Sequence, residues 1–161
     1  MHRGTGMEKR QIGIEEWMEM SRSGLKVPIT TLLQGDSMRP LIRLGKDPVT
    51  IVPVTEPLQI GDVVLFTDGK RYVVHRLWKL DPESGIAQTW GDNCKVPDAP
   101  VPLAQVYGKV VSYTRNGRVH RLDTERARSF GLFWMKHGLV RRFEILLYRI
   151  VRKLHKIISG K

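Results

Sequence analysis

Short runs of β-branched and aromatic residues alternate with glycine-containing turns through most of this 161-residue chain. The clearest turns are Asp68-Gly69 and Asn116-Gly117, dipeptides that favour two-residue β-hairpins. Short strands cannot bury a core alone, so they must pair with one another. The pattern predicts a mainly β fold, a compact antiparallel barrel or sandwich. Hydrophobic residues make up 41% of the chain, which is enough for a core of its own.

The turns also set the bounds of the expected strands. These strands are residues 28–33, 49–54, 63–66, 72–77, 87–90, 107–113 and 119–122. The chain is predicted to divide into an N-terminal extension with a short helix (1–24), a β domain (25–122) and a basic helical tail (123–161).

Three helices are expected outside the strands. Residues 14–23 favour a short helix in the N-terminal extension. In the tail, Asp123 or Thr124 can cap a helix that ends near Gly138. A second tail helix is predicted over residues 139–159.

Positive charge is concentrated in the tail. Residues 115–161 carry 13 Lys and Arg against three Asp and Glu, a net charge of +10, whereas residues 1–114 carry +1. On a helical wheel, the apolar residues of the second tail helix occupy one arc and the cations the opposite side. The residues expected to contact a membrane are Arg141, Arg142, Phe143, Arg149, Arg152, Lys153 and Lys156.

This amphipathic pattern predicts binding to an anionic membrane surface. Two alternatives stay open. The apolar arc can instead pack on the β domain, leaving the cations in solvent. Binding to nucleic acid is disfavoured, because the apolar stripe is continuous and lacks interleaved polar residues that read bases.

The chain shows no targeting segment. Its first 13 residues are polar and basic, and no apolar run reaches the roughly 18 to 20 residues that span a bilayer. The single cysteine, Cys94, excludes an intrachain disulfide. We interpret Cys94 as a bystander rather than a nucleophile. These features predict a cytoplasmic protein, peripheral on the membrane through its tail.

A serine, a histidine and two carboxylates follow one another in distinctive local settings. Ser37 lies in the segment 35–40, His75 in an apolar strand, and Asp92 and Asp98 in the loop that follows the next strand. Serine is a strong nucleophile when a base takes its proton and a carboxylate orients that base. Taken singly, the residues also fit a capping serine, a core histidine and aspartates in local Asx turns.

Five ordered motifs resemble those of the type I signal peptidase superfamily, which also holds the self-cleaving LexA-type repressors. They are Gly35-Asp36-Ser37-Met38-x-Pro40, Gly61-Asp62-Val63-Val64-x-Phe66, Val74-His75-Arg76, Gly91-Asp92-Asn93 with Asp98, and Val106-x-Gly108-Lys109-Val110. Together they cover about residues 28–113. The His75-Arg76 pair resembles the archaeal and endoplasmic-reticulum type, which uses a histidine base, rather than the lysine-base type.

The resemblance implies a serine endopeptidase that cleaves an extended leader or signal peptide without a metal or cofactor. It makes Ser37 the nucleophile, His75 the general base and Asp98 the catalytic aspartate. It also implies that Met38 shapes the pocket beside the nucleophile. The remaining supporting positions are Asp92 and Gly35.

Two features depart from the histidine-type signal peptidases. No transmembrane anchor precedes Ser37, and Gly35 stands where a hydroxyl residue often assists the oxyanion hole. The oxyanion donors would then be backbone N–H groups. The missing anchor favours a cytoplasmic enzyme that trims a dedicated precursor. The alternatives are a non-catalytic or self-cleaving regulator and a membrane-binding module with an inactive peptidase fold.

Overall fold

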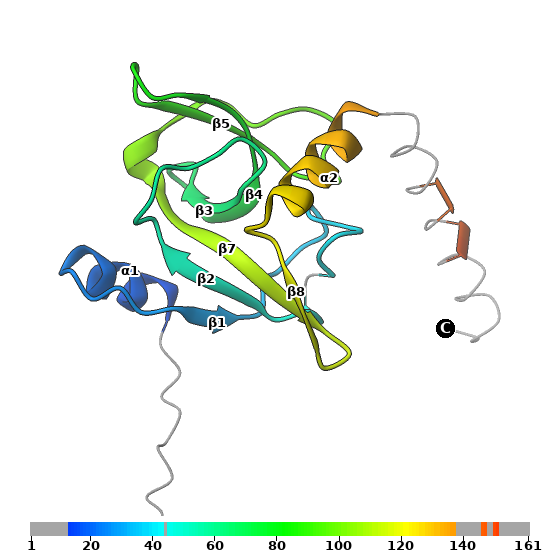
Figure 1. Cartoon of the computed structure of the whole chain (residues 1–161), viewed down its shortest axis with the longest axis horizontal. Helices are drawn as coiled ribbons and strands as arrows, with labels where there is room; N and C mark the ends of the chain where they lie inside the picture. Colours follow the sequence, from blue (N-terminus) through cyan, green and yellow to red (C-terminus); the bar gives the residue numbers. More distant parts are fainter. Residues whose placement is uncertain (1–12, 44, 138–145, 148–149, 152–161) are drawn as a thin grey trace, which may run out of the picture.

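The computed structural model describes residues 13–43, 45–137, 146–147 and 150–151, and Figure 1 shows its elements. The helices are α1 (Ile14–Arg22), the short 3-10 helix η1 (Leu103–Gln105) and α2 (Glu125–Lys136). The strands are β1 (Ile29–Thr31), β2 (Val49–Pro53), β3 (Val63–Thr67), β4 (Tyr72–Asp81), β5 (Ile86–Trp90), β6 (Val101–Pro102), β7 (Val106–Arg115) and β8 (Arg118–Arg121).

All eight strands belong to one antiparallel sheet that curls into a half-barrel (Figure 1). The order along the sheet is β1-β2-β7-β3-β4-β5-β6, and β8 pairs with β7 off this path. Register shifts interrupt the β2–β7, β3–β7 and β4–β5 pairings, and bulges of this kind bend a sheet. The predicted mainly β fold is confirmed.

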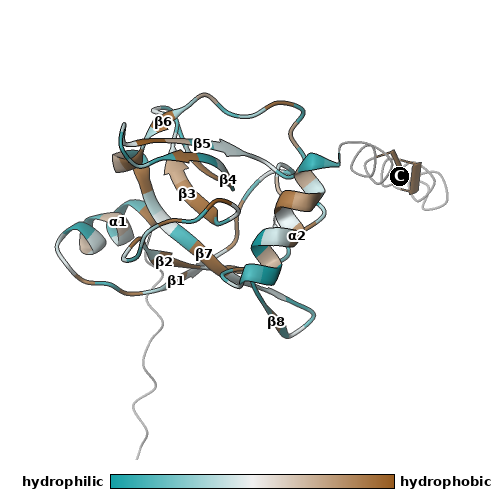
Figure 2. Ribbon diagram, turned by 45° about the horizontal axis from the view of Figure 1, so that its top comes forward, coloured by the Kyte–Doolittle hydropathy of each residue, from teal (hydrophilic) through white to brown (hydrophobic). Residues whose placement is uncertain are grey.

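β3 is buried on both of its faces because the curled sheet covers it. Val63 and Leu65 pack into a core with α1, β2 and β7, whereas Val64 and Phe66 pack into a second core with β4, β5 and β6. Successive residues of a strand point to opposite faces, so one strand serves both cores. Figure 2 shows this concentration of hydrophobic residues along β3.

Both predicted hairpins form. The Asp68-Gly69 turn joins β3 to β4, and Asn116 and Gly117 join β7 to β8 with φ angles of 52° and 74°. Positive φ at both central residues is what a type I′ turn requires. The short strand β6 and η1 were not predicted, because a two-residue strand that includes Pro102 shows no alternation.

The first tail helix forms as predicted and packs on the β domain. Thr124 caps α2 by accepting a hydrogen bond from a first-turn N–H. Gly131 lies directly against β4, since a Cβ there would come within 2.2 Å of Arg76 Cζ. Arg128 lies 3.5 Å from the carboxylate of buried Asp62. Helix α2 therefore packs against the β domain, and only its outer face is exposed to solvent.

The predicted second tail helix falls mainly outside the described residues. Residues 146–147 and 150–151 are helical and exposed. The predicted membrane contacts all lie outside the described residues: Arg141, Arg142, Phe143, Arg149, Arg152, Lys153 and Lys156. In the part of the chain that is described, none of the helices combines the length and apolar character needed to cross a membrane.

Candidate active site

Ser37 lies in the loop between β1 and β2. Gly35 precedes it with a φ of 101°, a left-handed conformation that favours glycine. A single turn follows, in which the N–H of Ile42 donates to the carbonyl of Met38 at 2.9 Å. Ser37 itself is half-buried. The sequence GDSMRP therefore forms a tight turn with the serine at its start.

Met38 lies in the core and not at the surface beside the serine. Its side chain is 0% exposed and packs in the same cluster as Trp17 and Ile42. From this position Met38 anchors the Ser37 loop to the core, and its role in the pocket beside the nucleophile stays a prediction.

His75 and Asp98 are in direct contact. His75 lies on β4 and is 5% exposed, and its Nδ1 is 2.6 Å from Asp98 Oδ2. The hydroxyl of Thr89 donates to the same carboxylate oxygen at 2.7 Å, and the side-chain amide of Gln88 donates to the Asp98 carbonyl at 2.9 Å. The carboxylate is thus held in place from β5 and fixes the orientation of the imidazole ring.

Asp92 pairs with Arg76 and not with His75. Its two carboxylate oxygens accept hydrogen bonds from Arg76 Nε and Nη2 at 2.9 and 2.8 Å. Arg76 also donates to the carbonyl of Gly61 at 2.8 Å. The two side chains are 1% and 2% exposed, so this is a fully buried ion pair. The two predicted carboxylates therefore have different partners.

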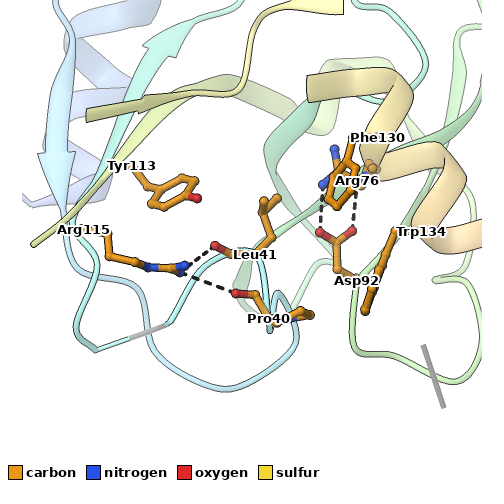
Figure 3. A pocket seen from close by; sticks show the side chains of 9 residues that line it. Pro40, Leu41, Arg76, Asp92, Tyr113, Arg115, Phe130 and Trp134 are labelled. Atoms are coloured by element: carbon orange, nitrogen blue, oxygen red, sulfur yellow. Dashed lines mark hydrogen bonds and ion pairs between the residues drawn. The ribbon is translucent and has the colours of Figure 1, made fainter. Parts of the chain in front are cut away.

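A pocket of about 190 Å³ lies on the Arg76 side of β4. Figure 3 shows the Arg76–Asp92 pair there, beside Phe130 and Trp134 from α2. Adjacent residues of a strand point to opposite faces, so this pocket lies on the face opposite His75. It is separate from the histidine–carboxylate pair.

Gly91 marks the point where three groups of the site converge. A Cβ at this position would come within 2.6 Å of Cys94 Sγ and within 2.9 Å of both His75 Nε2 and the Ser37 carbonyl oxygen. The N–H of Asn93 donates to that carbonyl at 2.7 Å. The fold therefore brings the Ser37 backbone to His75. Among the described residues, no hydrogen bond joins Ser37 Oγ to His75.

The charge state of His75 is set by its neighbours. Burial lowers the pKa of His75, but the hydrogen bond and the charge of Asp98, together with the neighbouring Cys94, outweigh burial and raise the pKa to about 9. At neutral pH the imidazole therefore holds its proton.

Sequence patterns did not predict the contacts of Thr89 and Cys94. The β4–β5 register pairs Leu77 with Thr89, which places the threonine on the His75 face, but a register shift beyond Leu77 hides this from simple counting along the hairpin. Cys94 returns to the site through a tight turn, in which its N–H donates to the Gly91 carbonyl at 2.8 Å. The Gly91-Asp92-Asn93 residues favour a turn, but their types do not indicate where the turn directs the Cys94 thiol.

No protein-family model matches this chain, and no curated protein sequence matches it either. Within the described ranges, no three His, Cys, Asp or Glu side chains are grouped so that they could hold a metal ion. The geometry offers a histidine oriented by a carboxylate beside a serine loop. This arrangement is suited to nucleophilic and acid–base chemistry.

Proposed function

We propose that this protein is a serine endopeptidase that cleaves an extended leader or signal peptide. Ser37 is the nucleophile, His75 the general base and Asp98 the group that orients the base. The observation that supports this most strongly is the 2.6 Å contact between His75 Nδ1 and Asp98 Oδ2, with Nε2 directed to the Ser37 loop. When Nδ1–H donates to the carboxylate, Nε2 of the neutral ring is the atom that can accept a proton.

The reaction follows from these positions. Ser37 Oγ attacks the scissile carbonyl carbon while neutral His75 takes the hydroxyl proton at Nε2. Asp98 stabilises the resulting imidazolium, which then protonates the departing amine. His75 next deprotonates a water molecule that releases the acyl group from Ser37.

Backbone groups are available for the oxyanion. Among the described residues, the N–H groups of Ser37 and Met38 donate no hydrogen bond within the chain. Gly35 offers no hydroxyl for this purpose. We therefore assign one oxyanion donor to the N–H of Ser37 at the start of the turn, because Met38 is fully buried and its N–H is out of reach of a substrate.

The substrate is an extended peptide. β1 is an edge strand of the sheet, because it pairs with β2 on one side only. The chain runs from β1 directly into the Ser37 loop. A peptide added as a strand beside β1 would pass the nucleophile. The resemblance to signal peptidases favours small residues before the scissile bond. A cytoplasmic enzyme that trims a dedicated precursor fits this proposal as well as a signal peptidase does.

A second candidate function is that of a regulatory or membrane-binding module with an inactive peptidase fold. The observation that favours it is that no hydrogen bond joins Ser37 Oγ to His75 among the described residues. Labelling with a fluorophosphonate separates the two functions. Labelling of the native chain but not of Ser37→Ala supports the peptidase, whereas labelling of neither supports the inactive module.

We expect Asp98→Asn to impair catalysis and Asp92→Asn to impair folding stability. Asp98→Asn should lower kcat/KM by on the order of 10²- to 10⁴-fold, because an amide cannot stabilise the imidazolium, while the Tm changes little. Asp92→Asn leaves the charge of buried Arg76 without its partner and should cost about 3–5 kcal/mol of folding stability. Thermal unfolding and peptide hydrolysis on the same samples test this. A wild-type Tm for Asp92→Asn, or wild-type activity for Asp98→Asn, would contradict the assignment.

We also propose that the tail holds the enzyme on an anionic membrane surface. Residues 115–161 carry a net charge of +10. Large apolar side chains are exposed on α2 and in the described residues that follow it in the sequence. They are Phe130, Phe133, Leu146, Leu147, Ile150 and Val151. Apolar side chains combined with clustered cations are typical of helices that lie in the bilayer interface.

The membrane proposal predicts a large effect of tail charge. Replacing Arg149, Arg152, Lys153 and Lys156 by Glu should weaken binding of the full chain to phosphatidylserine-containing vesicles by at least about 100-fold, because each cation contributes about 1 kcal/mol near such a surface. Wild-type binding should weaken at high salt without vanishing. Vesicle sedimentation measures both effects.

A charge-matched control separates tail binding from overall charge. The same number of exposed cations can be reversed in the β domain, at Lys26, Lys70, Arg71 and Lys79. This control should bind the vesicles nearly as well as the native chain. Equal loss of binding in both variants would show that net charge alone, and not the tail, governs membrane contact.

A further inference from the structure

Cys94 is held in a fixed position next to the base. Its N–H donates to the Gly91 carbonyl at 2.8 Å, and its own carbonyl accepts a hydrogen bond from Trp90 Nε1 at 2.9 Å. On one side, Asn93 is bound to the Ser37 loop through its backbone N–H and through its side-chain amide, which donates to a carbonyl there at 3.0 Å. The neighbouring residue Asn93 therefore ties the turn that holds Cys94 to the serine loop.

The Cys94 thiol lies close to His75 Nε2, the nitrogen that accepts the serine proton in the proposed peptidase mechanism. Cys94 Sγ and His75 Nε2 converge on the same point above Gly91, where an added Cβ would touch both. His75 is 5% exposed, and among the described residues no nitrogen or oxygen atom is hydrogen-bonded to its Nε2. Cys94 is also one of the neighbours that raise the pKa of His75, which fits a sulfur atom close to the imidazole.

Cys94 is also within reach of small reagents. Its side chain is partly exposed, whereas His75 is nearly buried. Thiolates next to a protonated histidine, in a partly open site, are the cysteines that react with electrophiles and oxidants. Cys94 has this setting, and Asp98 orients the imidazole from the other side.

We propose that Cys94 is a second nucleophile of this site, activated by His75 toward hydroperoxides, and that its oxidation switches off cleavage by Ser37. The second half of this proposal rests on the proposed peptidase function. The first half concerns thiol chemistry and stands independently of it.

The oxidation balances with a hydroperoxide as the oxidant. The Cys94 thiolate attacks one peroxide oxygen, so that an S–O bond forms as the O–O bond breaks. Sulfur loses two electrons, the peroxide is reduced, and the departing hydroxide or alkoxide takes the proton of the His75 imidazolium. The product, a sulfenic acid, adds an oxygen atom beside Nε2 and obstructs proton transfer from Ser37. Reduction by added thiol restores Cys94.

The first test measures thiol reactivity alone. Cys94 is the single cysteine of the chain, so iodoacetamide labelling reports on it without ambiguity. At pH 7 we expect His75→Gln to slow labelling at least about tenfold, because a thiol without a cationic partner is mostly protonated. The control His120→Gln should label at the native rate. Equal rates in native protein and His75→Gln would overturn the proposal.

The second test measures regulation. Hydrogen peroxide should inhibit peptide cleavage by the native chain, and dithiothreitol should restore it. Cys94→Ala, whatever its basal rate, should keep that rate in peroxide. Equal inhibition of native protein and Cys94→Ala would overturn the switch, since oxidation elsewhere would then be responsible. If neither the native chain nor Cys94→Ala cleaves peptides, the peptidase function fails, while His75-dependent labelling still decides the reactivity of Cys94.

Discussion

Ser37→Ala and His75→Gln should each lower peptide cleavage by on the order of 10⁶-fold, and the double variant should be no worse than either single one. The two residues perform one proton transfer, so removal of either eliminates the same step. His75→Gln keeps much of the volume of the imidazole inside the β4 face, where His75 is 5% exposed. Hydrolysis of a labelled peptide under single-turnover conditions measures the loss.

Two matched variants control for this experiment. Ser84→Ala changes an exposed serine in the β4–β5 turn, and His120→Gln changes a histidine on β8 that stacks on Tyr113. Both should keep native activity, and all four variants should keep the β-sheet circular dichroism of the native chain. Comparable turnover by Ser37→Ala or His75→Gln would exclude the proposed catalytic pair.

The second large effect concerns pH. An unperturbed histidine has a pKa of about 6.5, and this value alone predicts that cleavage is lost only below neutral pH. In the structure, Asp98 and Cys94 overcome the effect of burial and raise the pKa of His75 to about 9. Because its pKa is raised, the His75 ring stays protonated up to higher pH. A general base must be neutral, so activity requires a pH near or above this pKa. At pH 7 about 1% of the imidazole is neutral and at pH 9 about half, so we expect kcat/KM to rise about 50-fold between these pH values.

The pH profile of kcat/KM, measured with the native chain, tests this. Cys94→Ala removes one of the groups that raise the pKa of His75, so its inflection should move to lower pH. An inflection of the native chain near pH 6.5 would contradict the electrostatic role of these neighbours. Full activity well below pH 5 would exclude histidine as the base altogether.

Local sequence determined most of the elements. The Asp68-Gly69 and Asn116-Gly117 turns form because glycine and asparagine tolerate the left-handed φ that tight hairpins need. Thr124 begins α2 because its hydroxyl satisfies an N–H group that the first helical turn leaves free. These outcomes depend on neighbouring residues, so they can be predicted without a structure.

The partners within the candidate site were decided by tertiary structure. Asp92 and Asp98 lie in one loop, yet Asp92 meets Arg76 and Asp98 meets His75, because the loop turns between them and β4 points its adjacent residues to opposite faces. Cys94 meets His75 for the same reason. Such contacts depend on the path of a loop and on strand register over long range, and the short-range pattern of residue types carries little information about either.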